Sequence, residues 1–339
     1  MSLLRIALFC GPWFIVFSLA AAEEINMSDI PLPNNLLAPM ASLQAASVVC
    51  FLEGPAMDAE GNLFFSDING NRILKMDPQG SVSTFRADSG RTNGNTFDAQ
   101  GRLISCEGAE NGPGGRRRVV RTDMKTGEVA VLTERYEGKR YNSPNDVVVD
   151  PRGRIWFTDP LYALDRSIME HPHEAVYRID EGGKVQRVIT QPAIGRPNGV
   201  AISPNGKTLY VVDSDYSRPS GNRKIWAFDI ADDGAVSNQR QVYDFGRGRG
   251  GDGMRLDAQG NLWIAAGISK PRTANESADV PTGVYVISAE GKLLGRIPIP
   301  EDVITNLAFG GPEKKMLYVT AGKTVFKIQT AVAGYSLYP

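Results

Sequence analysis

The stretch Asp58-Ala59-Glu60-Gly61-Asn62-Leu63-Phe64-Phe65-Ser66-Asp67 sets the architecture, because its pattern returns five more times along the 339-residue chain. Each copy joins a polar turn that contains Gly to an apolar run of the kind that forms a buried strand. The later copies begin at Asp98, Asp150, Ser203, Asp257 and Gly311, and the last copy is the loosest. A period of about 40 to 55 residues is the length of one four-stranded propeller blade.

A second pattern follows each copy and predicts another strand. Apolar and polar residues alternate in it, as they do in a strand with one buried face. Its six occurrences are residues 72–77, 118–123, 175–180, 224–229, 283–288 and 324–329. The two patterns together predict an all-β chain folded as a six-bladed β-propeller. A β-sandwich would not explain the six-fold period. We expect residues 41–49 to add an edge strand to the last blade and close the ring.

Four short phrases place an oxygen-bearing side chain beside Gly or Pro at the start of a predicted strand. They centre on Glu53, Asn145, Asn198 and Asp252. Each of these residues lies five positions before the first residue of its repeat turn. The innermost strand of every blade lines the central channel. Equal offsets should therefore place the four side chains at one height, facing one axis.

Two carboxylates and two amides that meet on an axis would form an oxygen cage for a hard divalent cation. Such ions take carboxylate and carbonyl oxygens, whereas imidazole and thiolate suit softer metals. Any one of the phrases alone would favour an ordinary turn. Their shared offset favours a metal site formed by Glu53, Asn145, Asn198 and Asp252. Calcium is the first choice of ion, and magnesium, manganese or zinc are alternatives.

The chain also resembles the SMP-30/gluconolactonase family, which includes regucalcin, over residues 48–328. The resemblance rests mainly on residues 103–107, 135–146, 156–160 and 196–199. It implies a six-bladed propeller with one divalent cation in the channel and, in many members, hydrolysis of sugar lactones. Relatives on the same scaffold hydrolyse other lactones or organophosphates.

Carried over by position, the resemblance implies that Glu53, Asn198 and Asp252 are metal ligands and that Asn145 binds metal or substrate. Asp252 matches the residue that acts as base or nucleophile, so we expect it to be catalytic. Two departures concern the substrate alone. Ser143 stands where animal sugar lactonases carry Arg, and Gly108 stands where bacterial members often carry His.

Three further polar residues, Asn93, Asn95 and Asp146, lie near the predicted channel mouth. We expect them to contact substrate together with Asn145, although a structural turn is equally compatible with each. The predicted function is a metal-dependent hydrolase that opens the ring of a sugar lactone. The alternatives are hydrolysis of another lactone or an organophosphate at the same site, and a non-catalytic secreted propeller that binds carbohydrate.

Other classes of function find little support. The two histidines, His171 and His173, share one predicted loop, residues 161–174. The sequence has no Gly-x-Ser-x-Gly, no Cys-x-x-Cys and no phosphate-binding glycine loop. The 37 basic and 38 acidic residues give no field that would attract nucleic acid or an anionic membrane. The expected partner is a small-molecule lactone.

The first 22 residues have the features of a secretory signal peptide. Arg5 is followed by an apolar stretch, and Ala20-Ala21-Ala22 offers small residues for cleavage. We expect a leader over residues 23–45, the propeller over 46–330 and a C-terminal tail over 331–339. The mature protein would be secreted or periplasmic, without membrane contact. Cleavage would remove Cys10 and leave Cys50 and Cys106, which we expect to be free thiols.

Overall fold

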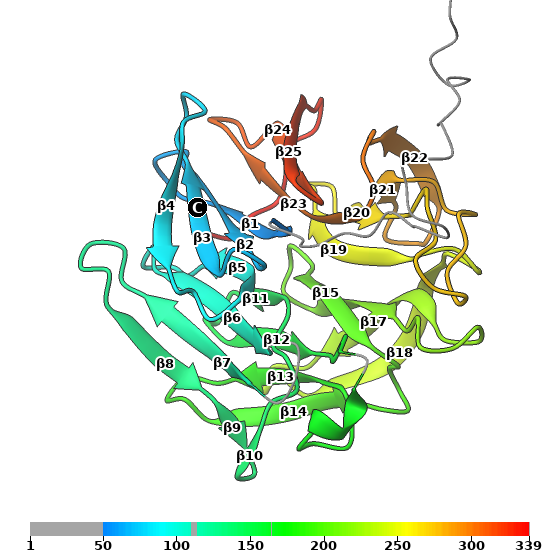
Figure 1. The fold of residues 1–339 in the computed structure, drawn as a ribbon, viewed down its shortest axis with the longest axis horizontal. Helices are drawn as coiled ribbons and strands as arrows, with labels where there is room; N and C mark the ends of the chain where they lie inside the picture. The colour runs from blue at the N-terminus through cyan, green and yellow to red at the C-terminus, as the bar shows by residue number, and fades with distance from the viewer. Residues whose placement is uncertain (1–49, 110–113, 164, 339) are drawn as a thin grey trace, which may run out of the picture. The chain divides into compact units, whose positions relative to one another are not determined.

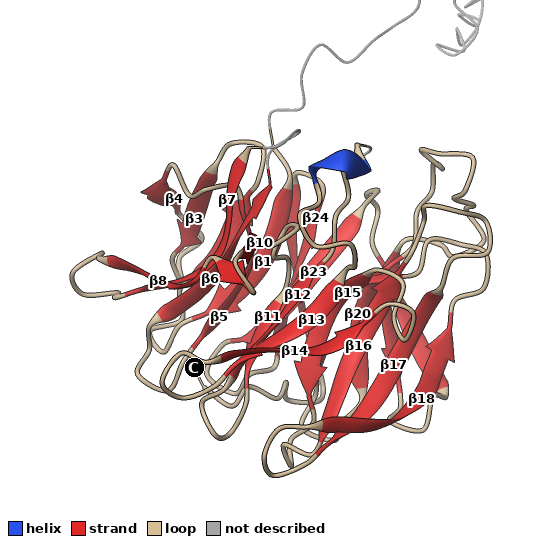
Figure 2. Ribbon diagram, turned by 90° about the horizontal axis from the view of Figure 1, so that it is seen from below, coloured by secondary structure: helices blue, strands red, loops and turns tan. Residues whose placement is uncertain are grey.

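The structure, a computed structural model, describes residues 50–109, 114–163 and 165–338. These residues form six antiparallel sheets of three or four strands, arranged as the blades of a propeller, which confirms the predicted fold class (Figure 1). Within each blade the strands pair in sequence order. The helical part of the described chain is one short 3₁₀ turn, η2 (Arg166–Ile168), drawn in blue in Figure 2.

The strands of the blades follow one another along the chain without crossovers. Blades one and two consist of β1 (Leu52–Met57), β2 (Leu63–Asp67), β3 (Arg72–Met76), β4 (Val82–Ala87), β5 (Thr92–Phe97), β6 (Leu103–Ala109), β7 (Gly115–Thr122) and β8 (Val129–Thr133). A small hairpin of β9 (Arg135–Tyr136) and β10 (Lys139–Arg140) precedes blade three. Blades three and four consist of β11 (Val147–Val149), β12 (Ile155–Asp159), β13 (Ala175–Ile179), β14 (Val185–Thr190), β15 (Pro197–Ile202), β16 (Thr208–Ser214), β17 (Arg223–Ile230) and β18 (Val236–Asp244). Blades five and six consist of β19 (Gly251–Leu256), β20 (Leu262–Ala266), β21 (Gly283–Ile287), β22 (Leu293–Pro298), β23 (Ile304–Gly310), β24 (Met316–Ala321) and β25 (Thr324–Gln329).

The repeated sequence pattern is the turn between the first and second strands of each blade. In the first copy, the Asp58 carboxylate accepts a hydrogen bond of 2.7 Å from the backbone N–H of Asn62. Asp98, Asp150 and Asp257 accept the same bond from the residue four positions later. Gly61 has φ +83°, a left-handed conformation that favours glycine. The Asp and the Gly recur because both favour this turn; Ser203 replaces the Asp in the fourth copy, and Lys314, with φ +53°, stands at the Gly position in the sixth.

The core consists of apolar clusters between neighbouring blades. Six clusters of buried residues are found in the described chain, and each joins two adjacent blades. Between blades three and four, for example, Trp156 packs with Val176, Val200 and Phe228. The cluster around Leu52 and Ala308 joins blade one to blade six. Burial therefore holds the ring together at every blade boundary.

Contacts between the first and last blades close the ring. The backbone N–H of Leu52 donates to the carbonyl of Gly322 at 2.8 Å, and the Thr305 hydroxyl donates to the Leu52 carbonyl at 2.7 Å. The expected edge strand at residues 41–49 lies outside the described residues, as do the expected signal peptide and leader. Cys50 and Cys106 are free cysteines. Across the described ranges, no helix has the length and apolar character needed to cross a bilayer.

The last residues cross the end of the channel at which the repeat turns lie. Gly334 bridges to Asp257, and the N–H of Tyr335 donates to the Leu256 carbonyl at 2.8 Å. The Tyr338 hydroxyl donates to the Asp150 carbonyl at 3.2 Å. The C-terminal segment thus runs from blade six past blade five to blade three.

A bulge interrupts the first strand of most blades. Glu53 pairs with Ser66 and Ala56 pairs with Phe64, so β1 has one residue more than β2 over this interval. The same shift occurs between Thr92 and Asn95, Pro197 and Val200, Gly251 and Met254, and Ile304 and Asn306. A bulge changes the direction of a side chain and bends the strand. The predicted ligands Glu53, Asn198 and Asp252 all lie at these bulges.

Candidate active site

One residue of every blade occupies the same position relative to the repeat turn. The four predicted ligands are joined by Asn93 and Asn306, which lie five positions before Asp98 and Gly311. We call these six residues the axial ring; its members are Glu53, Asn93, Asn145, Asn198, Asp252 and Asn306. They lie at the end of the channel opposite the repeat turns, because each lies shortly before the first strand of its blade or within the first three residues of that strand.

Glycine next to the ring residues lets neighbouring blades approach closely. A Cβ added at Gly54 would lie 2.1 Å from the carbonyl oxygen of Asn93, and Gly54 has φ +50°. A Cβ at Gly199 would lie 2.4 Å from the carbonyl oxygen of Asp252. The glycine that follows the ligand in these phrases is therefore required by contact with the ring residue of the next blade.

The two carboxylates of the ring are buried near each other. Glu53 is 3% exposed and Asp252 is 5% exposed. Burial, and then the negative charge of Asp252, raise the pKa of Glu53 well above its usual range. Burial also raises the pKa of Asp252, while Arg249 opposes this increase. Two close carboxylates with little solvent gain stability from a bound cation.

Asn198 contacts the carboxylate of Asp252 and the hydroxyl of Tyr162. Its Nδ2 lies 2.7 Å from the Tyr162 Oη, and its side chain hydrogen-bonds Asp252. Because the amide nitrogen donates to Tyr162, the amide oxygen is left as a possible metal ligand. Glu53, Asn198 and Asp252, predicted from different blades, are thus brought together.

Asn145 lies in blade three, directly before β11. Its side chain is 6% exposed, and its backbone is fixed by two bonds. Its N–H donates to the Thr158 carbonyl at 2.8 Å, and its carbonyl accepts from the N–H of Gly94 at 2.7 Å. Its role as metal ligand or substrate contact stays a prediction.

Two buried oxygens, one on a ring residue and one on the residue that follows Asn145, have no hydrogen-bond partner among the described residues. They are the Oδ1 atoms of Asn93 and Asp146. The other carboxylate oxygen of Asp146 lies 3.5 Å from the Arg255 guanidinium, and burial raises the pKa of Asp146. A buried acceptor without a donor is costly, so these oxygens suit a bound ligand or ion.

Asn95, by contrast, uses its whole amide within the protein. Its Nδ2 donates to the Gly54 carbonyl at 2.8 Å and to the Ser66 hydroxyl at 2.9 Å. Its Oδ1 accepts from the Ser105 hydroxyl at 2.7 Å, and its exposed fraction is zero. These hydrogen bonds hold the backbone at Gly54, the residue that follows Glu53. The predicted contact with substrate would require these bonds to break.

The two positions at which the sequence departs from the resembling family lie next to each other. The Ser143 hydroxyl accepts a hydrogen bond of 2.9 Å from the N–H of Ala109. A Cβ at Gly108 would lie 3.1 Å from that hydroxyl oxygen. The Ser143 hydroxyl is therefore hydrogen-bonded to a residue of blade two.

Three residues of the site were missed by sequence reasoning. Asn306 donates to the Glu53 carboxylate at 3.3 Å, and its offset from Gly311 would have identified it. Arg249 and Tyr162 come from loops without a repeated pattern. Arg249 is 5% exposed, and its guanidinium contacts Asp252 at 2.8 Å and Glu276 at 3.4 Å.

The donor set fits a hard cation better than a soft one. In the part of the chain that the structure describes, no three side chains of His, Cys, Asp or Glu converge as a metal cluster. The axial ring instead offers two carboxylates and the amides of Asn145 and Asn198. Its composition, with the unpaired oxygens of Asn93 and Asp146, matches the oxygen preference of calcium and magnesium.

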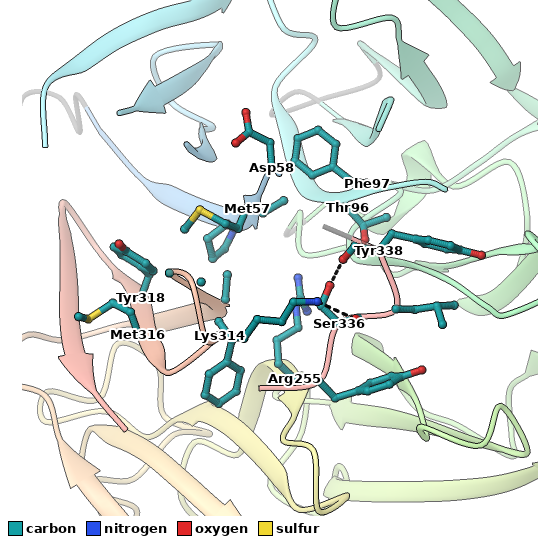
Figure 3. Close-up of a pocket in the computed structure, with 18 of the residues that line it drawn as sticks. Met57, Asp58, Thr96, Phe97, Arg255, Lys314, Met316, Tyr318, Ser336 and Tyr338 are labelled. Atoms are coloured by element: carbon teal, nitrogen blue, oxygen red, sulfur yellow. Dashed lines mark hydrogen bonds between the residues drawn. The ribbon is translucent and has the colours of Figure 1, made fainter. Parts of the chain in front are cut away.

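A cavity of about 1000 Å³ lies at the other end of the channel (Figure 3). Met57, Asp58, Arg255 and Tyr338 are among the residues that line it, whereas the four predicted ligands are not. In Figure 3, Lys314 donates to the Ser336 carbonyl, at 3.0 Å, where the C-terminal segment crosses this end. The cavity extends along the channel towards the candidate site, because Asn95 and Arg255, which contacts Asp146, are also among its lining residues.

The fold and the site define a six-bladed propeller with an oxygen-rich axial ring. Residues 51–323 match the family model described as SMP-30/Gluconolactonase/LRE-like region. The chain belongs to this family.

Three proteins illustrate the similarity. The gluconolactonase of Zymomonas mobilis subsp. mobilis is 31% identical over 311 residues, which cover 85% of this chain and 81% of that protein. The solved gluconolactonase from Xanthomonas campestris is 33% identical with a TM-score of 0.69, covering 85% and 87%. The solved regucalcin from Agrobacterium tumefaciens, a calcium-binding protein, shares the fold with a TM-score of 0.66 at 20% identity, covering 85% and 93%.

Proposed function

We propose that this protein is a lactonase that opens the ring of a sugar lactone with the help of one divalent cation at the axial ring. The observation that carries the proposal is the buried pair of carboxylates, Glu53 and Asp252, with Asn198 beside them. The similarity to gluconolactonases supports the choice of substrate class. Oxygen ligands suit calcium and magnesium alike, and calcium is our first choice of ion.

Glu53, Asn145, Asn198 and Asp252 would hold the ion. When bound, the ion supplies Lewis acidity that polarises the lactone carbonyl. Asp252 is the base: its carboxylate takes a proton from the attacking water, or attacks the carbonyl carbon itself. Arg249 favours the ionised form of this carboxylate and orients it, since its guanidinium donates to Oδ2. Asn93 and Asp146 offer acceptors for substrate hydroxyls.

We infer that the site is reached from the end of the channel away from the C-terminal segment. Because that segment crosses the opposite end, substrate enters and product leaves at the ring. We also propose that the protein acts outside the cytoplasm, which the signal-like N-terminus supports.

Measuring ring opening of D-glucono-δ-lactone with and without a chelator tests the proposal. We expect turnover that stops when metal is removed and returns with added calcium. Turnover that persists after complete metal removal would contradict metal dependence. A panel with aliphatic lactones and a phosphotriester tests the substrate class. Turnover confined to those compounds would contradict the sugar substrate.

A further inference from the structure

Tyr162 lies between the solvent and the axial ring. The second strand of each blade runs back to the end at which the first strand begins, so the segment between β12 and β13 lies at the site end of the channel. Tyr162 belongs to that segment. Its hydroxyl contacts Asn198 at 2.7 Å, yet the residue is 42% exposed. One end of the side chain is therefore at the ring and the rest faces the approach to it.

The position of Tyr162 is fixed by buried charged groups. The Arg196 guanidinium lies 5.2 Å from the centroid of the Tyr162 ring. Arg196 pairs with Glu174 at 3.3 Å, and the same Glu174 oxygen accepts from the N–H of Leu161 at 2.8 Å. Arg166 adds a third contact to Glu174 at 2.7 Å. Because Glu174 holds both Leu161 and Arg196, the ring of Tyr162 is preorganised.

Both parts of the Tyr162 side chain have chemistry suited to a sugar. The hydroxyl oxygen accepts from Asn198, so its own proton can be donated to an oxygen of a ligand. The aromatic ring supplies rigid apolar area at low entropic cost. A sugar lactone has an apolar C–H face and a hydroxylated edge, whereas an aliphatic lactone lacks the hydroxyls.

We propose that Tyr162 determines specificity for hydroxylated lactones: its hydroxyl accepts from Asn198 and donates its own proton to a sugar hydroxyl, while its ring packs against the C–H face of the sugar. The inference rests on the proposed lactonase function and identifies the residue that selects the substrate class. It gives Tyr162 two separable roles. The ring and the hydroxyl proton act on substrate affinity, and the hydroxyl oxygen acts on the orientation of a metal ligand.

The test compares Tyr162→Ala and Tyr162→Phe on two lactones of equal ring size, D-glucono-δ-lactone and δ-valerolactone. Ser167→Ala, an exposed change in the same segment, is the matched control. We expect Tyr162→Ala to raise the KM of gluconolactone about 10-fold. The KM of δ-valerolactone, or its inhibition constant if it is not turned over, should rise by less than about 3-fold, because this lactone loses only the contact with the ring. Tyr162→Phe, which keeps the ring, should leave the gluconolactone KM within about 3-fold of wild type.

Calorimetric titration with calcium gives a readout of the hydroxyl that does not depend on turnover. Both Tyr162 variants should bind calcium a few-fold more weakly than wild type, because Asn198 loses one of its two hydrogen-bond partners. Ser167→Ala should match wild type in both assays. Equal KM changes for the two lactones in Tyr162→Ala, or no change for either, would overturn the specificity role. Unchanged calcium affinity in both Tyr162 variants would overturn the role of the hydroxyl.

Failure of the lactonase function is distinguishable from failure of this inference. If wild type turns over neither lactone, the proposed function is wrong, and binding of D-gluconate measured by calorimetry becomes the test of Tyr162. Weaker binding in Tyr162→Ala than in wild type and Ser167→Ala would support the inference. Equal binding by all three proteins, or none, would overturn it.

Discussion

Arg249 and Asp252 form a buried ion pair: the Arg249 Nη2 lies 2.8 Å from the Asp252 Oδ2, and each side chain is 7% exposed. Glu276 holds the same guanidinium from the other side at 3.4 Å. The pair therefore fixes one carboxylate oxygen of Asp252. Removing one charge of a buried pair is strongly destabilising, because the other charge stays buried without a partner. If Asp252 is neutralised, Glu276 still pairs with Arg249, so the loss of stability should be smaller.

Replacement of Asp252 by Asn should abolish most hydrolysis while the protein stays folded. The amide keeps the shape of the side chain but cannot take a proton. We expect kcat/KM to fall at least about 100-fold. Asp257→Asn is a useful comparison, because this buried residue lies in the turn at the opposite end of the same strand. It should lower the melting temperature and leave kcat/KM near that of wild type. A fast Asp252→Asn variant would show that another group is the base.

Glu53→Gln should weaken metal binding more than it slows turnover at saturating metal. The change removes one of the two ring charges and leaves the hydrogen bonds to Gly54 and Asn306 geometrically possible. We expect the calcium dissociation constant, measured by calorimetry, to rise about 10- to 100-fold. Calcium should also raise the melting temperature of wild type more than that of the variant. An unchanged dissociation constant would exclude Glu53 as a ligand.

Gly199→Ala should damage the site by moving Asp252. The new methyl group would lie 2.4 Å from the Asp252 carbonyl oxygen, so blades four and five must separate there. We expect activity to fall about 10-fold or more and stability to drop by about 1–3 kcal/mol. Gly295→Ala on β22 is the matched control, since nothing lies within 4 Å of its added Cβ. Equal behaviour of the two variants in activity assays and denaturant titrations would refute the close-approach explanation.

Asp159 should make stability depend on pH. Burial raises its pKa to about 7, against the opposing hydrogen bonds from the N–H groups of Asn142 and Ser143. An unfolded Asp loses its proton near pH ~3.9. The folded state therefore binds more protons between these values. The contribution of Asp159 to stability is fully present below pH ~4 and is lost as the pH rises towards 7.

The measurement is denaturant unfolding from pH 5 to pH 8 at saturating calcium, for wild type and Asp159→Asn. The stability of wild type relative to the variant should decline across this range, by on the order of 3 kcal/mol at most. A difference that does not vary with pH would mean that Asp159 is ionised throughout. Identical calcium in both series prevents metal binding from contributing to the trend.

The repeat made the fold and part of the site predictable from sequence. The Asp that accepts a backbone hydrogen bond and the Gly with positive φ recur in most of the turns, so their spacing reveals the blade period directly. The same spacing identifies Glu53, Asn198 and Asp252, and these three residues do lie together. It would have identified Asn306 as well, if the loose sixth copy had been treated like the others.

The remaining parts of the site depend on contacts between distant residues, which a local sequence pattern cannot predict. Arg249 and Tyr162 come from connections whose paths are set by packing against other blades. The sequence of residues 161–174 did not predict the hydrogen bond between the Tyr162 hydroxyl and Asn198. Asn95 was predicted at the channel mouth, yet its amide is held by Gly54, Ser66 and Ser105. Its direction is set by the bulge in β5, and bulges arise from pairing register between strands.

Because the same backbone position recurs in every blade, a substitution at one of these positions could change which metal ion the propeller prefers. Asn306 already lies within 3.3 Å of the Glu53 carboxylate, on the same kind of bulge that bears the predicted ligands. Asn306→Asp keeps the size of the side chain and adds a third negative charge. A site with three carboxylates attracts trivalent ions more strongly than divalent ions. The variant should therefore bind terbium in preference to calcium, which sensitised lanthanide luminescence would report, and the propeller would become a luminescent tag.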